Sequence, residues 1–251
     1  YEEQGGYRKG RGTMDQIFTL YAMIQKYISK RKGRMYCIFI DFTKAFDTIP
    51  HYFLWHRLIK EGIHGKLLKV LQSMYSQFSS CVQTPEGLTD FFSCNIGTRQ
   101  GCLLSPFLFC FYLNQLIKMQ MDEGIRGIQV TEIAPNIFML LYADDIAMCG
   151  DTVGEIQKML NVLSEFCNKW GLKVNLSKTK IMVFRNGGYL KKCEKWFFQG
   201  HTVDTASFYK YLGLLFTTKL SWTKAKKTLV TQAQKALVML KQVHRDRKSV
   251  V

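Results

Sequence analysis

The chain has 251 residues, 47% of them hydrophobic and 14% aromatic, so it can bury the core of one large domain or two small ones. Its 35 Lys and Arg against 19 Asp and Glu give a formal net charge of +16, which favours a polyanionic partner such as nucleic acid, although an anionic membrane surface would attract it too. The longest apolar stretches fall well short of the roughly 18 residues that a transmembrane helix needs, and no secretory signal is visible. These features argue against a membrane-embedded or secreted protein, and they are compatible with a nucleic-acid-binding protein or an enzyme.

The first half of the chain mixes helical and strand patterns without repeats or low-complexity linkers, which predicts one α+β unit. The chain opens at Tyr1 rather than Met, which we interpret as an excerpt of a longer protein or a processed product. In chain order we expect an amphipathic helix at 15–29, a strand ending in an acid at 35–41, and two short helices at 53–60 and 66–78. A hairpin around Pro85-Glu86-Gly87 is expected at 80–95, and an apolar helix that begins with Pro at 106–120.

The second half begins with the run 138–149, two apolar strands broken only by Asp144-Asp145. Thr152-x-x-Glu155 is typical of a capping box, and the helix that follows is expected to end at Gly171. Further strands are expected at 173–176, 180–184, 196–198 and 208–216, and a basic amphipathic helix at 222–244.

Eight cysteines show neither a Cys-x-x-Cys pair nor a matched pair of histidines. This spacing argues against a zinc module, and we expect most of the thiols to be buried and reduced.

The Asp144-Asp145 pair is the strongest indication of a site. Asp tolerates turns and is costly inside a sheet, so two apolar strands around the pair predict a buried hairpin with the acids at its tip. Adjacent carboxylates repel unless a cation joins them, although the dipeptide alone is also typical of a plain surface turn.

Asp41 ends an apolar strand, and a strand end and a hairpin tip can sit side by side in one sheet, although Asp41 has the alternative of capping the next segment. Carboxylates without His or Cys select Mg²⁺ or Mn²⁺ over zinc. A pair of such ions suits phosphoryl transfer.

Several segments together resemble the motifs of reverse transcriptases. The three central motifs appear in the family's order as Phe39–Asp47, Arg99–Pro106 and Tyr142–Asp145, and two later ones as Gly171–Lys180 and Tyr211–Gly213. The segment Gly5–Ile17 resembles the fingers of non-long-terminal-repeat (LINE-type) retrotransposon enzymes, so the resemblance extends from about Gly5 to about Thr217.

The resemblance implies roles for individual residues. Asp41, Asp144 and Asp145 match the catalytic, metal-binding carboxylates, with Mg²⁺ expected and Mn²⁺ possible in its place. Phe46 matches the aromatic gate against a ribose 2′-hydroxyl, and its alternative is an ordinary core Phe. Lys178 matches a lysine near the departing pyrophosphate, a role for which Lys180 competes.

Other matches concern nucleotide, primer and template. Gln100 and Gly101 resemble residues of the nucleotide pocket, and Arg99 is expected near phosphate or template unless it is a solvated surface residue. The resemblance implies a primer grip formed by Tyr211, Leu212 and Gly213, although Tyr211 is equally typical of a core residue. Contacts with the template are expected for Arg8, Lys9 and Arg11.

The implied fold is a polymerase palm, an antiparallel sheet backed by helices, with partial fingers and a thumb that is absent or only begun. We expect fingers at 1–34, palm at 35–217 and a basic helix at 218–251, which follows duplex phosphates or is simply solvated. The implied function is RNA-directed DNA synthesis in retrotransposition, inside the nucleus or cytoplasm as a ribonucleoprotein, with an RNA template, a DNA primer or target DNA, and deoxynucleoside triphosphates. A catalytically inactive nucleic-acid-binding remnant, and another palm-type nucleotidyltransferase such as a cyclase or an RNA-templated RNA polymerase, remain alternatives.

Overall fold

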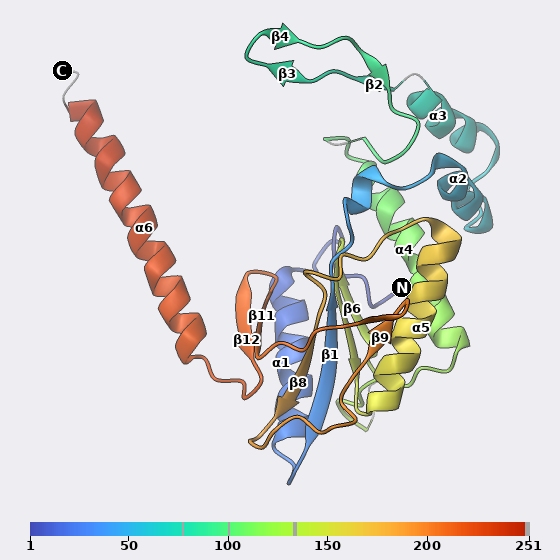
Figure 1. Cartoon of the computed structure of the whole chain (residues 1–251). Helices are drawn as coiled ribbons and strands as arrows, with labels where there is room; N and C mark the ends of the chain where they lie inside the picture. Colours follow the sequence, from blue (N-terminus) through green and yellow to red (C-terminus); the bar gives the residue numbers. More distant parts are fainter. Residues whose placement is uncertain (77, 100, 133–134, 249–251) are drawn as a thin grey trace.

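A computed structural model of the chain describes residues 1–76, 78–99, 101–132 and 135–248, with side chains described through residue 241. Its centre is a four-stranded antiparallel sheet in the order β6-β7-β1-β8 (Figure 1). The strands are β1 (Arg34–Ile40), β6 (Met139–Tyr142), β7 (Asp145–Gly150) and β8 (Lys180–Arg185). They are almost wholly apolar because both faces of the sheet are covered, as strands buried on two sides require.

Successive side chains of β1 point to opposite faces and join two separate cores. Ile38 and Ile40 belong to the core formed with the helices α4 (Ser105–Asp122) and α5 (Val153–Trp170). Cys37 and Phe39 belong to the core formed with helix α1 (Thr13–Ile28) and the hairpin of β11 (Phe208–Tyr211) and β12 (Leu214–Thr217). Helices therefore lie on both faces of the sheet, which confirms the predicted α+β class.

Helix α5 begins and ends where the sequence predicts, with one difference in its cap. The Thr152 side chain accepts a hydrogen bond from the Glu155 N–H at 3.2 Å, and Gly171 takes a left-handed φ of 77° after the last turn. The Glu155 carboxylate does not complete the capping box at Thr152; it accepts from the Arg126 and Gly127 N–H groups at 2.9 and 2.8 Å. The acid thus joins α5 to the loop after α4 rather than closing its own helix end.

The segment between β1 and α4 stands above the sheet in Figure 1. It comprises the short 3-10 helix η1 (Ala45–Asp47), the helices α2 (His51–Lys60) and α3 (Gly65–Ser76), and a long hairpin. The predicted hairpin is present, but its strands are interrupted: β2 (Ser79–Ser80) pairs with β5 (Phe92–Ser93), and β3 (Gln83–Thr84) pairs with β4 (Gly87–Leu88).

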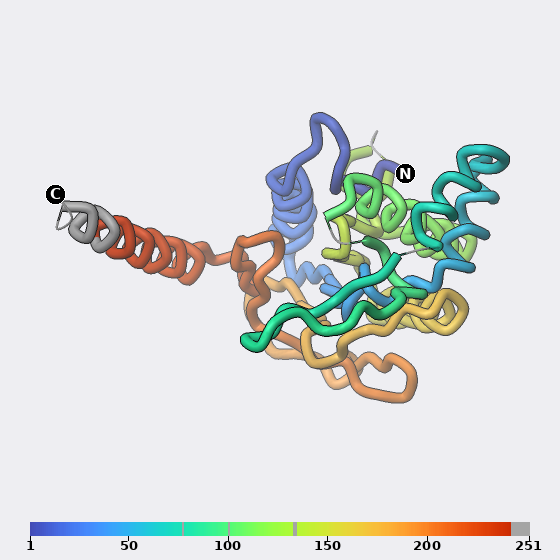
Figure 2. The backbone as a smooth tube through the Cα atoms, turned by 90° about the horizontal axis from the view of Figure 1, so that it is seen from above, coloured from blue at the N-terminus to red at the C-terminus, as the bar shows by residue number. Residues whose placement is uncertain are grey.

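The C-terminal part departs from the sequence prediction in two places. Residues 208–216, predicted as one strand, form the β11–β12 hairpin, because Leu212 and Gly213 take left-handed φ values of 46° and 88° and turn the chain. Residues 173–176 form no strand: Val174 makes an isolated antiparallel bridge with Phe42, just past the end of β1, and the pairing does not continue beyond the two hydrogen bonds that flank it. A short pair follows, β9 (Phe197–Phe198) with β10 (His201–Thr202), and then the β11–β12 hairpin. Helix α6 (Thr223–Lys248) projects far from the body (Figure 2).

The cysteines are free thiols, but fewer are buried than expected. Only Cys37, Cys149 and Cys167 are buried, four are intermediate and Cys193 is exposed, because several occupy loops and helix faces at the margin of the core. None of the helices in the described ranges is both long and apolar enough to cross a membrane.

Candidate active site

The three predicted carboxylates meet at one end of the central sheet. The antiparallel register of β1 and β7 pairs Ile40 with Ile146, so one further step along it sets Asp41 opposite Asp145. Tyr142 pairs with Asp145 at the end of the β6–β7 hairpin, which leaves Ala143 and Asp144 as its two-residue turn. The acids therefore differ in position: Asp144 lies in the turn, and Asp145 is the first residue of β7.

The turn adopts a conformation that a side chain rarely takes. Ala143 has a left-handed φ of 59° at the first turn position, where a hairpin usually has glycine. Its side chain is 8% exposed, so the surrounding chain must hold this conformation in place.

The charges at this end of the sheet repel one another. The pKa of Asp145 is raised above its ordinary value, first by burial of its carboxyl and then by the negative charges of Asp144 and Asp41. A cation among the three side chains would relieve both effects, because it replaces lost hydration and neutralises the repulsion.

Lys178 supplies a positive charge next to Asp41. Its Nζ lies 3.7 Å from Asp41 Oδ2, while the Asp41 backbone is held by Thr179 Oγ1 at 3.1 Å and by the Asn175 N–H at 2.8 Å. Lys180 instead pairs with Asp204 at 2.7 Å. The structure thus brings Lys178, rather than its competitor, to the carboxylates, and its chemical role stays a prediction.

The three carboxylates have the chemistry that a hard divalent cation prefers, but their oxygens are not close enough together to hold one. Carboxylate oxygens are the ligands that Mg²⁺ and Mn²⁺ prefer. Within the described ranges, no group of three or more His, Cys, Asp or Glu side chains is gathered closely enough to hold a metal ion. An ion would therefore have to draw the carboxylates together and compete with Lys178 for Asp41.

A largely apolar cavity of about 700 Å³ contains the predicted gate residue. Phe46 stacks on Phe109 with ring centroids 4.3 Å apart, and its carbonyl accepts a hydrogen bond from the Thr98 N–H at 2.7 Å. Gly101, at a left-handed φ of 81°, lines the same cavity. Gln100 lies outside the described residues.

Arg99 lines this cavity but directs its guanidinium toward α3. The group lies 4.9 Å from the centre of the Phe78 ring and donates a hydrogen bond to the Met74 carbonyl at 3.3 Å. These contacts hold the loop before α4 against α3, and the predicted contact with phosphate or template stays a prediction.

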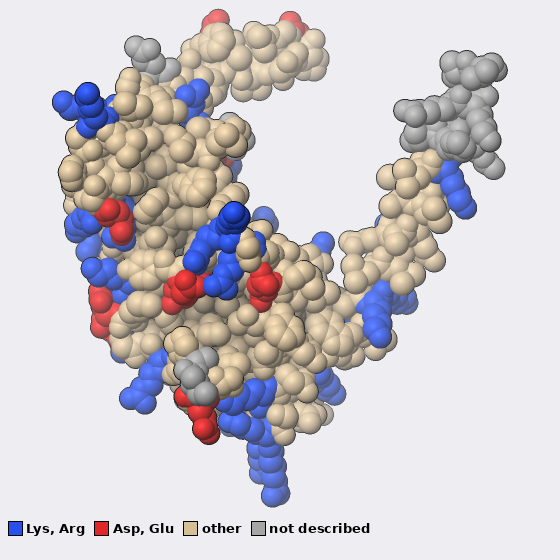
Figure 3. All heavy atoms as spheres, turned by 180° about the vertical axis from the view of Figure 1, so that it is seen from behind, with Lys and Arg blue, Asp and Glu red and all other residues tan. Residues whose placement is uncertain are grey.

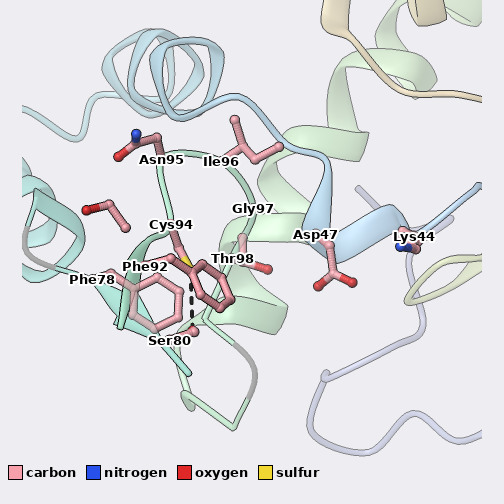
Figure 4. A pocket seen from close by; sticks show the side chains of 11 residues that line it. Lys44, Asp47, Phe78, Ser80, Phe92, Cys94, Asn95, Ile96, Gly97 and Thr98 are labelled. Atoms are coloured by element: carbon pink, nitrogen blue, oxygen red, sulfur yellow. Dashed lines mark hydrogen bonds between the residues drawn. The ribbon is translucent and has the colours of Figure 1, made fainter. Parts of the chain in front are cut away.

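A second cavity of about 700 Å³ opens on the other side of Thr98 (Figure 4). Phe78 and Phe92 lie on one wall, where the Cys94 thiol donates a hydrogen bond to Ser80 Oγ at 3.3 Å, and Lys44 and Asp47 of the η1 segment lie on the other. The two cavities together place the η1 segment, which carries Phe46, between two open spaces.

The β11–β12 hairpin contributes a residue that the sequence interpretation missed. Tyr211 is buried and its hydroxyl has no hydrogen-bond partner among the described residues, while Leu212 and Gly213 form the turn. Tyr209 instead lies near the carboxylates: its ring stacks on Phe39 at 4.3 Å and 9°, and burial, followed by the charges of Asp145 and Asp41, raises its pKa to about 12. The alternation of β11, which sets Tyr209 and Tyr211 on one face, was the available signal.

Two of the three predicted cationic residues near the N-terminus form ion pairs within the chain. Both guanidiniums pair with Glu2, Arg8 at 3.1 Å and Arg11 at 2.5 Å, whereas Lys9 makes no ion pair in the described part of the chain. Tyr7, also missed from the sequence, lines the Phe46 cavity, and its pKa is raised by burial and by the charge of Asp144. Template contacts for Arg8, Lys9 and Arg11 stay predictions.

Comparisons with known proteins agree with this arrangement. The model of the family "Reverse transcriptase (RNA-dependent DNA polymerase)" matches residues 1–216, and the chain therefore belongs to this family. It is 24% identical over 233 residues to a probable RNA-directed DNA polymerase from transposon X-element of Drosophila melanogaster, covering 89% of this chain and 24% of that protein. It is 27% identical over 220 residues to the Pol polyprotein of the type-1 retrotransposable element R2 of Popillia japonica, covering 83% of this chain and 30% of that protein.

Solved structures of similar fold include telomerases. The telomerase from Candida albicans, in complex with a fragment of telomeric RNA, matches with a TM-score of 0.61 at 13% identity, over 88% of this chain and 35% of that one. Apo telomerase from Candida tropicalis matches with a TM-score of 0.56 at 16% identity, over 88% and 40% of the two chains. These likenesses confirm the fold, and the retrotransposon relatives confirm the resemblance found in the sequence.

Proposed function

We propose that this chain is the polymerase core of a retrotransposon protein and adds deoxynucleotides to a primer 3′-hydroxyl on an RNA template by two-metal phosphoryl transfer. The chain spans about a quarter to a third of the length of the curated relatives it matches, so the activity of the whole protein is part of the proposal. The observation that carries it is the meeting of Asp41, Asp144 and Asp145 at one sheet end.

Each site residue has a proposed role that follows from its position. Asp41, Asp144 and Asp145 would hold Mg²⁺ or Mn²⁺, which when bound supplies activation of the 3′-hydroxyl and neutralisation of the triphosphate. Phe46, braced on Phe109, would close the cavity against a ribose 2′-hydroxyl and so favour deoxynucleotides. Lys178 would leave Asp41 for the departing pyrophosphate as a cation or proton donor.

The primer and template belong to the surfaces around this sheet end. The β11–β12 hairpin, whose Tyr209 lies close to Asp41 and Asp145, would align the primer terminus. Lysines and arginines are spread over the face seen in Figure 3 and along the projecting α6, and a net charge of +16 favours phosphate backbones in general. We propose a ribonucleoprotein in the nucleus or cytoplasm as the setting.

Primer extension with varied substrates tests the proposal. The chain is mixed with a DNA primer on an RNA template and with deoxynucleotides and Mg²⁺, and parallel reactions omit the template, omit the metal or replace the deoxynucleotides by ribonucleotides. The proposal expects extension only with template, metal and deoxynucleotides together. Product without a template would indicate a cyclase, and equal use of ribonucleotides an RNA polymerase. Binding of the template–primer with no extension would indicate an inactive binding module.

A further inference from the structure

The segment from Glu3 to Gly6 lies along the outer edge of the catalytic hairpin. Strand β6 is the edge strand of the central sheet, and its Leu141 exchanges two hydrogen bonds with this segment: the Leu141 N–H donates to the Glu3 carbonyl at 2.9 Å, and the Gly5 N–H donates to the Leu141 carbonyl at 2.8 Å. The pairing is parallel and stops two residues before the Ala143–Asp144 turn. The segment therefore covers the edge that leads into the active site.

One side chain of this segment reaches the turn itself. The Gln4 side-chain oxygen Oε1 accepts a hydrogen bond from the Gly6 N–H at 2.8 Å and a second one from the Ala143 N–H at 3.2 Å. Gln4 is only 4% exposed, and its Nε2 has no partner among the described residues, so the hydrogen bonding of this buried amide is directed at the two backbone groups.

The approach of the two backbones leaves no space for a side chain at Gly6. A Cβ added there would lie 2.4 Å from the backbone nitrogen of Ala143, closer than atoms of this kind can approach. The same Ala143 N–H that Gln4 holds is therefore also the atom against which Gly6 packs. Two residues of the N-terminal segment converge on the residue directly before Asp144.

We infer that Gln4 is a positioning residue that holds the Ala143–Asp144 turn in the conformation the metal-binding carboxylates require. An apolar side chain would leave the buried N–H groups of Gly6 and Ala143 unpaired, which destabilises that conformation. A carboxylate would accept the same bonds but add negative charge next to Asp144. The neutral amide satisfies both conditions. This inference rests on the proposed metal site.

The test measures Mn²⁺ binding by the whole chain, followed from the electron paramagnetic resonance signal of free Mn²⁺, so it does not depend on polymerase activity. Gln4→Met removes the acceptor at similar size, and Gly6→Ala places a Cβ against the same Ala143 nitrogen and so displaces the turn. Gln25→Met and Gly12→Ala are the matched controls: Gln25 is an exposed residue of α1, and a Cβ at Gly12 meets nothing closer than 3.8 Å. Asp144→Asn reports the metal site itself. Thermal melts fix a temperature at which every variant is folded.

The inference expects Gln4→Met and Gly6→Ala each to bind Mn²⁺ roughly threefold to tenfold more weakly while folded, with both control variants binding like the parent. A purely structural role for Gln4 predicts a lower melting temperature with unchanged Mn²⁺ affinity, and that result would overturn the inference. If parent and Asp144→Asn bind Mn²⁺ equally, the proposed metal site fails and the positioning role fails with it. If Asp144→Asn binds more weakly than the parent but both test variants do not, only the role of Gln4 fails.

Discussion

The sheet end that carries the carboxylates and the helix α6 that leaves the body contain similar apolar side chains in opposite environments. Ile40, Ile146 and Met148 are at most 3% exposed, whereas Leu237 and Leu240 of α6 are 52% and 68% exposed. Within the part of α6 whose side chains are described, contact with the body is made at its start, where Trp222 packs on Phe216 and Lys224 Nζ lies 3.3 Å from the centre of the Phe208 ring. The core therefore packs around the strands that position the carboxylates, whereas the described apolar side chains of α6 after its first turn stay exposed.

Truncation of one leucine in the core that contains Ile40 and Ile146, and of one leucine on α6, gives the largest expected contrast in stability. Leu163→Ala removes a fully buried side chain of α5, and we expect it to lower the free energy of unfolding by about 2–5 kcal/mol. Leu237→Ala on the exposed arm should change it by less than about 0.5 kcal/mol. Urea titrations followed by tryptophan fluorescence measure both values. Equal losses would show that the packing of the arm has been misjudged.

Truncation of Phe46, the predicted gate residue, extends the comparison to the cavity that it lines. Phe46→Ala removes the ring braced on Phe109, and we expect the preference for deoxynucleotides over ribonucleotides to fall by about tenfold to a hundredfold. Competing single-nucleotide additions measure this ratio. Phe18→Ala, at an exposed aromatic residue of α1, is the control and should leave the ratio unchanged. An unaltered preference in Phe46→Ala would remove the gate assignment.

The raised pKa of Asp145 predicts how pH affects the metal-free chain. Because the folded state holds the proton of Asp145 more tightly than the unfolded state, the stability due to this group is present at low pH and is lost as pH rises from the ordinary value of 3.8 through the raised pKa. Mn²⁺ affinity should increase over the same window, by up to about tenfold per pH unit, because the ion replaces the proton. Melts and Mn²⁺ titrations across this window, with Asp145→Asn as reference, measure both effects. The account is wrong here if parent and variant show the same pH slope.

Removal of the competing cation gives the smallest expected effect. Lys178→Gln frees Asp41 from a partly exposed ion pair, and we expect Mn²⁺ to bind no more than about fivefold more tightly, since such pairs contribute up to about 1 kcal/mol. Lys173→Gln on the same loop is the control. Weaker Mn²⁺ binding in Lys178→Gln would contradict the competition between Lys178 and the metal.

Much of this molecule could be predicted from local sequence because its elements are marked locally. Alternation and apolar runs indicate β1, β6 and β7, capping residues indicate α5, and a strand that ends in an acid indicates Asp41. Segment 173–176 was predicted wrongly as a strand, because it pairs with the chain just past β1 through a single antiparallel bridge, too short for a strand. The domain limits at residues 34 and 217 stay predictions.

The parts of the site that sequence reasoning missed depend on contacts between distant segments. Gln4 meets Ala143 across the edge of the sheet, and Tyr209 meets the carboxylates only because β11 folds back over Phe39. Periodicity describes one element at a time and carries no signal for such meetings. The pairing of Lys178 rather than Lys180 with Asp41 likewise follows from a contact between distant segments, the hydrogen bonds of Asn175 and Thr179 to the Asp41 backbone.

The most direct test of the central claim is primer extension by Asp144→Asn next to its matched control Asp151→Asn. Asp144 lies in the β6–β7 turn, and Asp151 is an exposed residue directly after the other end of β7. Extension is measured on an RNA template with deoxynucleotides and Mg²⁺, together with template affinity. The account predicts a loss of at least about a thousandfold in extension for Asp144→Asn with template affinity retained, and near-parent extension for Asp151→Asn. Undiminished extension in Asp144→Asn, or equal losses in both variants, would contradict it.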